Sequence, residues 1–351
     1  MNKSQTIVFQ NNSFDYLRHL AAFSVVALHI VTHLRLTETL FISYLLSYYQ
    51  GVVVLFGISG FLIAASFEKC STKKEFFIKR IKRLYPGLWG AFGVSFLLIL
   101  FLYSPALDLK RILVWFSTQL TFLQFYTPDW LREYGNGTPN GSLWTIVVEL
   151  QFYVLVGLFF NRLKSLTDKQ WILVIGGSIA CNILTKIAEA YLPHILFKLL
   201  FQTFIPYVYI FLIGVFIYIN RERILPALCH YCWWIFILYT LIFTIYFLRS
   251  PVSIGHYTSI ISGVFIPFIT IAMAYRFGRH RIPFDISYGI YLYHMIFINV
   301  MLETNIEPKV LAAILVLVFT IGFAFVSYYF IEKPFTHIKL WGHHSLEDQK
   351  I

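Results

Sequence analysis

Residues 14–33 read FDYLRHLAAFSVVALHIVTH, an apolar run that is long enough to cross a bilayer as one helix. Arg18 and His29 lie within this run. Their spacing makes about three helical turns, so the two side chains share one face and lie ~16 Å apart along the axis. Ionisable groups at membrane depth usually mark a substrate path or a reaction centre. The alternative is an arginine that reaches the interface beside a hydrogen-bonded structural histidine.

The composition indicates a membrane protein with several spans. Of the 351 residues, 58% are hydrophobic and only 13% are charged, whereas about 25% are charged in soluble domains. The net charge of +11 is explained by basic loops that set the orientation of membrane helices, so we expect no nucleic-acid partner. Cys229 and Cys232 form a C-x-x-C pattern without a second ligand pair, so we predict no metal site.

Hydropathy predicts an all-α bundle of about ten transmembrane helices. The predicted spans are 14–33, 41–67, 87–103, 142–161, 171–190, 196–219, 227–248, 257–275, 286–302 and 310–331. A further apolar piece at 112–126 is short and is interrupted by polar residues. We therefore expect this piece to be interfacial or re-entrant rather than spanning.

The distribution of basic residues supports this topology. If 112–126 does not span, the loops on one side hold 15 Lys and Arg in 44 residues, and the opposite loops hold 6 in 67. The positive-inside rule then places the basic loops and both termini in the cytoplasm. We expect residues 1–335 to form one membrane domain and residues 336–351 to form a short cytoplasmic tail.

The predicted topology brings a carboxylate and an imidazole to a similar depth. The span that begins near Ser142 enters from the outer side, so Glu149 lies ~10 Å below that surface. His29 rises from the cytoplasm to about the same level. We therefore predict a His29–Glu149 pair in which Glu149 orients the imidazole and raises its basicity. A purely structural pair is the alternative.

Six motifs in order carry a family resemblance. They are FDYLRHLAA at 14–22 with His29 after it, FGISGFLI at 56–63, FIKRIKRLYP at 77–86, SLWTIVVELQFY at 142–153, ISYGIYLYH at 286–294 and IEKPF at 331–335. Together they resemble the signatures of the acyltransferase-3 family of membrane acyltransferases. Two positions depart from the pattern: Val53 stands where an Asp is frequent, and Thr145 stands where a Ser is usual.

The resemblance implies a surface-polysaccharide O-acetyltransferase in a bacterial cytoplasmic (inner) membrane. Members of the family move an acyl group, most often acetyl, from cytoplasmic acyl-CoA to a hydroxyl of a lipid-linked or extracytoplasmic glycan such as O-antigen or exopolysaccharide. The expected partners are acyl-CoA, the glycan acceptor and membrane lipid. We expect acetyl-CoA as a substrate, no bound cofactor and no additional esterase-like domain. The oligomeric state is not determined by the sequence.

The residue chemistry is consistent with acyl transfer. His29 can act as the general base for the acceptor hydroxyl or as a transient acyl carrier, and the sequence does not choose between them. Arg18 lies one layer further in than the basic loop, and we group it with His29 and Glu149 as catalytic. The phosphates of the donor are expected at Lys79, Arg80 and Arg83, for which membrane orientation alone is the alternative role.

Further substrate contacts are expected from the later motifs. Ser287, Tyr291 and His294 follow one helical stripe and can line the acyl or sugar path, although packing between helices would give the same spacing. Ser59 and Trp144 stand inside their motifs, and the resemblance implies substrate contacts for both. A secondary transporter and a non-catalytic assembly factor of glycan synthesis are the rival classes. The sequence lacks the paired broken helices typical of transporters.

Overall fold

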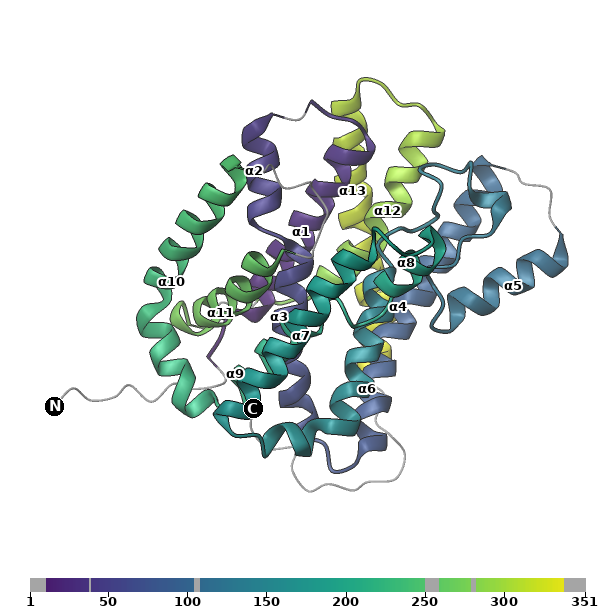
Figure 1. Cartoon of the computed structure of the whole chain (residues 1–351). Coiled ribbons are helices and arrows are strands. Elements are labelled where there is room, and N and C mark those ends of the chain that lie inside the picture. Colours follow the sequence, from purple (N-terminus) through teal and green to yellow (C-terminus); the bar gives the residue numbers. More distant parts are fainter. Residues whose placement is uncertain (1–10, 38, 104–107, 250–258, 279–281, 338–351) are drawn as a thin grey trace.

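The computed structural model describes residues 11–37, 39–103, 108–249, 259–278 and 282–337. Within these ranges every regular element is a helix (Figure 1). The predicted all-helical fold is therefore confirmed for the described residues. The predicted tail at 336–351 lies outside the described residues except for its first two positions.

Seven helical stretches of the described chain are long and apolar enough to cross a membrane. They are α1 (Phe14–His33), α2 with α3 (Leu40–Tyr48 and Gly51–Glu68), α4 (Lys73–Leu102), α6 (Trp144–Lys164), α7 (Asp168–Ala188), α10 (Arg221–Arg249), and α13 with η2 and α14 (Lys309–Ser327, Tyr328–Glu332 and Lys333–His337). The other predicted spans contain shorter helices: α8 (His194–Phe201) and α9 (Val208–Ile219), α11 (Ile260–Arg276), and α12 (Ser287–Glu303). The total of ten spans therefore stays a prediction.

The basic segment before the third predicted span is helical rather than a loop. Thr72 caps α4 by accepting a hydrogen bond from the Glu75 backbone, and the helix then continues through Pro86 to Leu102. The Glu75 side chain in turn accepts from the Ser71 backbone, so the start of the helix is stabilised on both sides. The basic residues are therefore held on a rigid helical face instead of a mobile connection.

The short piece at 112–126 does not form a spanning helix. The corresponding helix α5 (Leu109–Leu120) has 12 residues and is ~18 Å long, whereas the hydrocarbon core is ~30 Å thick. Its last carbonyls accept hydrogen bonds from the side chains of Trp89 and Tyr85 on α4. These bonds satisfy the end of α5 where it meets α4. The shortness of α5 agrees with the expectation that this piece does not span, which stays a prediction.

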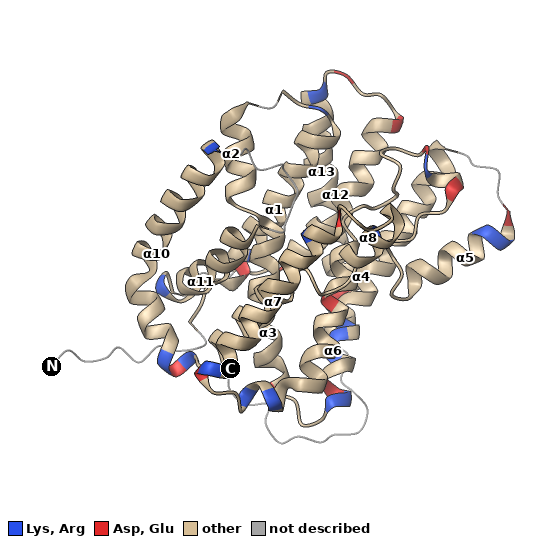
Figure 2. Ribbon diagram, in the orientation of Figure 1, with Lys and Arg blue, Asp and Glu red and all other residues tan. Residues whose placement is uncertain are grey.

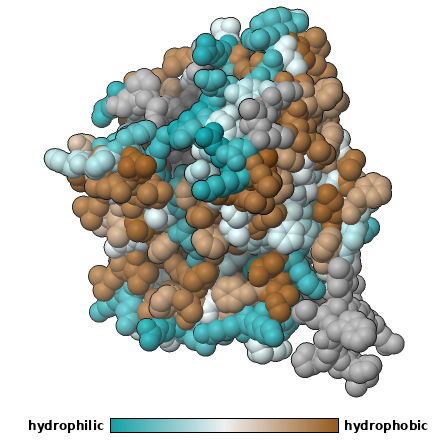
Figure 3. Space-filling model, turned by 90° about the vertical axis from the view of Figure 1, so that its right-hand side faces the viewer, coloured by the Kyte–Doolittle hydropathy of each residue, from teal (hydrophilic) through white to brown (hydrophobic). Residues whose placement is uncertain are grey.

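The core is built around α12, α3 and α9. Helix α12 is almost entirely buried and packs against α1, α4 and α13. Helices α3 and α9 cross closely at Gly60 and Gly214, where a Cβ atom on Gly60 would lie 2.0 Å from the Phe211 carbonyl oxygen. Small residues allow this approach, as expected for packing within a membrane. Figure 3 shows hydrophobic side chains over much of the molecule's flank, with hydrophilic ones along its lower edge.

One end of the bundle gathers basic helix termini, and we call it the basic end (Figure 2). Glu68 at the end of α3 pairs with Lys164 of α6 and Arg221 of α10. Asp168 of α7 pairs with Arg223 of α10. These ion pairs place the termini of four helices together at the same face.

Candidate functional site

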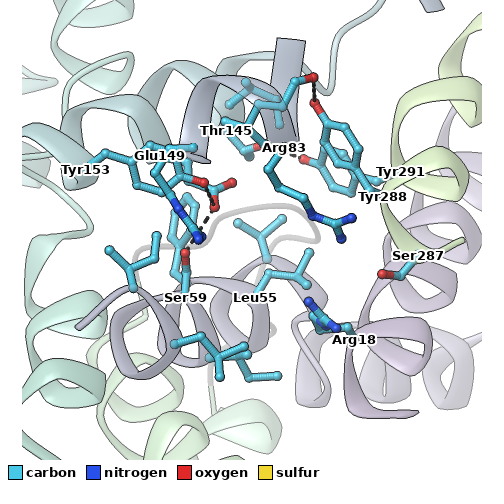
Figure 4. Close-up of a pocket in the computed structure, with 18 residues that line it drawn as sticks. Arg18, Leu55, Ser59, Arg83, Thr145, Glu149, Tyr153, Ser287, Tyr288 and Tyr291 are labelled. Carbon is cyan, nitrogen blue, oxygen red and sulfur yellow. Dashed lines mark hydrogen bonds between the residues drawn. The ribbon is translucent and has the colours of Figure 1, made fainter. Parts of the chain in front are cut away.

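A cavity lies between α1, α3, α4, α6 and α12, with charged side chains at two of its sides (Figure 4). Arg18, Arg83 and Ser287 lie on one side, and Glu149 and Ser59 lie on the other. Its polar lining also includes Arg80, Thr145, Tyr153, Tyr288 and Tyr291. Most of the residues predicted as site residues are therefore brought together around one space.

Arg18 and Arg83 share one carboxylate, that of Asp285. The Asp285 Oδ2 atom lies 3.1 Å from Arg18 Nη2 and 2.8 Å from Arg83 Nη2. Ser287 donates from its Oγ to the other carboxylate oxygen at 2.6 Å, and Arg18 also pairs with Asp15 on its own helix. Burial alone would raise the pKa of Asp285, but the charges of the two arginines and the Ser287 hydrogen bond hold it well below its usual range.

Arg80 is a cation without a carboxylate partner among the described residues. Its guanidinium donates to Ser66 Oγ at 2.8 Å and lies over the Tyr153 ring. Its Nε atom is buried and has no hydrogen-bond partner, and the same is true of Arg18 Nε. Buried donors of this kind usually have a partner, so their presence in the wall fits an anionic ligand.

Glu149 belongs to the cavity and not to a histidine. Its Oε1 atom accepts from Ser59 Oγ at 3.1 Å and from Tyr153 Oη at 2.7 Å. The Ser59 bond joins α3 to α6 on the side of the cavity opposite the two arginines, and the Tyr153 bond lies within α6. The expected contact between Glu149 and His29 is absent.

His29 is paired instead with His294 of α12. His29 Nδ1 lies 2.7 Å from His294 Nε2, and the two rings are stacked with centroids 5.0 Å apart. His294 is completely buried, and its Nδ1 lies 3.3 Å from the Ile290 carbonyl oxygen. His33, one turn after His29, has its ring 5.6 Å from that of His29.

Tyr291 connects the cavity with the histidine pair. It lines the cavity, its ring lies 5.8 Å from the ring of His294, and its hydroxyl lies 2.6 Å from Thr145 Oγ1. Helices α6 and α12 run in opposite directions through this contact. Counted from the Tyr291–Thr145 contact, Glu149 lies one helical turn toward the basic end. His294 lies nearly one turn from the same contact in the opposite direction. The two side chains are thus ~10 Å apart along the axes, which is why they do not meet.

A loop at residues 135–142 packs along α12. In this 135–142 loop, Asn140 donates to the Leu292 carbonyl at 2.8 Å, and the Asn299 amide donates to two loop carbonyls. Asn136 of the same loop lies 3.4 Å from His33 Nδ1. The loop therefore anchors the start of α6 to the helix that carries His294.

Besides His294, two further predicted substrate residues, Lys79 and Trp144, lie apart from the cavity's polar lining. Lys79 pairs with Glu75 at 2.7 Å on the outer face of α4, and its side chain is 46% exposed. Trp144 stands at the first turn of α6, and its ring contacts those of Phe56 and Tyr207. The structure assigns both residues packing or surface contacts with neighbouring side chains.

Sequence reasoning missed Asp285 and Tyr288. Asp285 stands two residues before Ser287 in the chain, so an acid beside the ISYGIYLYH motif was the available signal. Tyr288 lines the cavity and donates to the Leu84 carbonyl at 2.9 Å. Neither residue can be assigned a partner from spacing along a single helix.

The fold and the cavity define a multi-pass membrane protein with a cationic site inside its helical bundle. A family model described as an acyltransferase domain matches residues 11–329, so the chain belongs to the acyltransferase-3 family. It is an O-acyltransferase.

Curated relatives agree with this assignment. The chain is 26% identical to Nodulation protein 10 of Rhizobium leguminosarum bv. viciae, over 92% of both chains. It is 24% identical to the O-acetyl transferase of Shigella phage Sf6, over 51% of this chain and 54% of the relative. It is 27% identical to the peptidoglycan O-acetyltransferase OatA of Listeria monocytogenes, over 41% of this chain and 23% of the relative. No solved structure gives a significant match.

Proposed function

We propose that this enzyme transfers an acetyl group from cytoplasmic acetyl-CoA to a hydroxyl of a lipid-linked or extracytoplasmic glycan, such as O-antigen or exopolysaccharide, in a bacterial cytoplasmic membrane. The observation that carries the proposal is the arrangement of a cationic cavity next to the His29–His294 pair within one bundle. Two of the curated relatives bear the name of O-acetyltransferases, which supports acetyl as the transferred group. An assembly factor needs no such buried charges, and the sequence lacks the paired broken helices that are typical of a transporter.

The donor enters from the basic end, which we place in the cytoplasm by the positive-inside rule. Arg18, Arg80 and Arg83 line the cavity there, and guanidinium groups bind phosphate oxygens through charge-assisted hydrogen bonds. Asp285 holds two of these guanidiniums in place before the donor arrives. Glu149, Ser59 and Ser287 then line the path of the acyl arm.

His29 performs the proton transfer in this proposal. The acceptor hydroxyl gives its proton to the imidazole as its oxygen attacks the thioester carbonyl carbon. The carbon–sulfur bond then breaks, and the same proton passes to the leaving thiolate, which yields free CoA and the acylated sugar. A transient acyl group on His29 would use the same nitrogen as nucleophile.

The test combines a purified enzyme with analysis of cells. Wild-type protein in lipid nanodiscs should release CoA from acetyl-CoA, and release should rise when a glycan acceptor is added. Mass spectrometry of surface glycan should show acetyl groups that disappear when the gene is deleted. A purified protein that releases no CoA, together with unchanged glycan in the deletion strain, would refute the proposal.

A further inference from the structure

The contacts of the histidine pair indicate which ring nitrogen of His29 carries the proton and which carries the free lone pair. His294 Nδ1 faces the carbonyl oxygen of Ile290 at 3.3 Å. A carbonyl oxygen only accepts hydrogen bonds, so the proton of His294 belongs on Nδ1. The opposite assignment would direct a nitrogen lone pair at an oxygen lone pair inside a completely buried site.

The state of His294 then determines the state of His29. A buried imidazole without a carboxylate partner favours the neutral form, because burying an unpaired charge is costly. With its proton on Nδ1, neutral His294 has a lone pair on Nε2. The 2.7 Å contact to His29 Nδ1 is then a hydrogen bond in which His29 donates and His294 accepts.

We propose that His294 is a positioning residue that fixes the tautomer of His29, with the proton on Nδ1 and the free lone pair on Nε2. This inference rests on the proposed function of His29. The side chain of His29 is only partly buried, and its Nε2 contacts no hydrogen-bonding group among the described residues. Nε2 is therefore the nitrogen that accepts the hydroxyl proton, or attacks the thioester carbonyl in the acyl-carrier variant of the reaction.

The surroundings hold His294 in this role. Tyr291 lies against its ring, and the Tyr291 hydroxyl is held by Thr145 and by the Ser142 carbonyl at 3.1 Å. The 135–142 loop is tied to the same helix through Asn140. Among the described residues, His33 on the same helix is a further titratable group whose ring lies beside that of His29. The Glu149 carboxylate that was expected to orient His29 has other partners, so the orienting function passes to a neutral acceptor.

Two substitutions of His294 separate positioning from packing. In His294→Gln the amide oxygen can accept the His29 hydrogen bond near the place of the imidazole Nε2, whereas His294→Met fills a similar volume without a strong acceptor. We expect His294→Met to lower kcat by about 10²- to 10⁴-fold with an unchanged KM for acetyl-CoA. His294→Gln should stay within about tenfold of wild type. Ile296→Met, on the same buried helix, is the control for inserting methionine and should keep wild-type rates.

A second measurement is independent of turnover. Protein labelled with ¹⁵N-histidine, studied by NMR without donor or acceptor, should show a His29 whose unprotonated nitrogen is Nε2, with the signal assigned by its loss in His29→Asn. Equal losses of kcat in His294→Met and His294→Gln, with both proteins folded, would overturn the proposal. Full activity of His294→Met would also overturn it, and so would an NMR spectrum in which Nδ1 of His29 is unprotonated. A protein that shows the expected tautomer but releases no CoA would instead refute the proposed function and leave the tautomer assignment intact.

Discussion

The cationic cavity and the histidine pair lie on the same two helices but use charge in opposite ways. Helix α1 supplies Arg18 to the cavity and His29 to the pair. In the same order, the segment before α12 supplies Asp285 to the cavity and α12 itself supplies His294 to the pair. Both helices rise from the basic end, so the two layers are ~13–16 Å apart. The cavity holds fixed charges that can bind an anion. The pair excludes charge and offers one directed lone pair.

In the proposed mechanism, this difference separates donor binding from the chemical step along the helix axes. A phosphate needs cations whose positions are set beforehand, which Asp285 provides by holding two guanidiniums. A histidine that accepts a proton must have a neutral ring with a defined tautomer. A nearby carboxylate would work against this neutral state, because it favours the charged imidazolium. Substitutions in the two layers should therefore differ in whether they change kcat or KM.

The largest effect is expected at the histidine layer. His29→Ala should abolish acetylation of surface glycan, with a loss of at least about 10²- to 10⁴-fold in rate, because no other described side chain supplies the same lone pair. The protein should still insert and accumulate, since the spans remain intact. Glycan mass spectrometry and immunoblotting of membranes check this. Thr32→Ala, on the exposed face of the same helix, is the matched control. Full acetylation by His29→Ala would end the catalytic assignment.

The next effect concerns the cavity. Arg83→Ala should raise the KM for acetyl-CoA by about 10- to 100-fold with little change in kcat, since a phosphate contact remote from the chemistry gives largely uniform binding. Lys79→Ala is the control, because Lys79 pairs with Glu75 outside the polar lining, and its KM should change by about twofold or less. Initial rates at varied acetyl-CoA provide the measurement. A KM for Arg83→Ala equal to that of Lys79→Ala would contradict a donor site at this arginine.

A double-mutant cycle tests whether the two layers are independent. Glu149→Gln and His294→Gln are each expected to cause moderate losses, and the losses should multiply, because the two residues share no described partner. The coupling in kcat/KM should lie within ~0.5 kcal/mol of zero. Strong non-additivity would restore the pairing between Glu149 and the histidines that the sequence predicted.

The smallest effect on activity is expected from two cysteine substitutions. Their labelling reports which side of the membrane each end of the bundle faces. In a Cys181→Ser background, Glu307→Cys in the loop after α12 should react with a membrane-impermeant maleimide in intact cells. Lys169→Cys at the basic end should react only after permeabilisation. Both variants should keep wild-type activity. If both sites react from the same side, the placement of the cavity toward the cytoplasm is wrong.

Much of the fold was predictable because hydropathy acts locally along the chain. The apolar runs located the helices, and the shortness of 112–126 excluded a span there. The breaks within the apolar runs were not predictable from the sequence, since each break depends on contacts with residues of other helices. The run at 196–219 breaks near Pro206, where Gln151 and Asn182 of other helices satisfy the exposed backbone groups. The run at 41–67 breaks before Gly51, which packs against the Ala21 carbonyl of α1.

The sequence by itself determined the membrane class, the family and the common face of Arg18 and His29, because hydropathy, motif order and helical spacing are properties of single segments. Only the tertiary structure decided that His29 bonds to His294, that Glu149 faces Ser59 and Tyr153, and that Asp285 joins two arginines. Spacing gives the approximate depth of a side chain but not the rotation and offset of one helix against another. Hydrogen-bond partners depend on that rotation and offset to within a few ångströms.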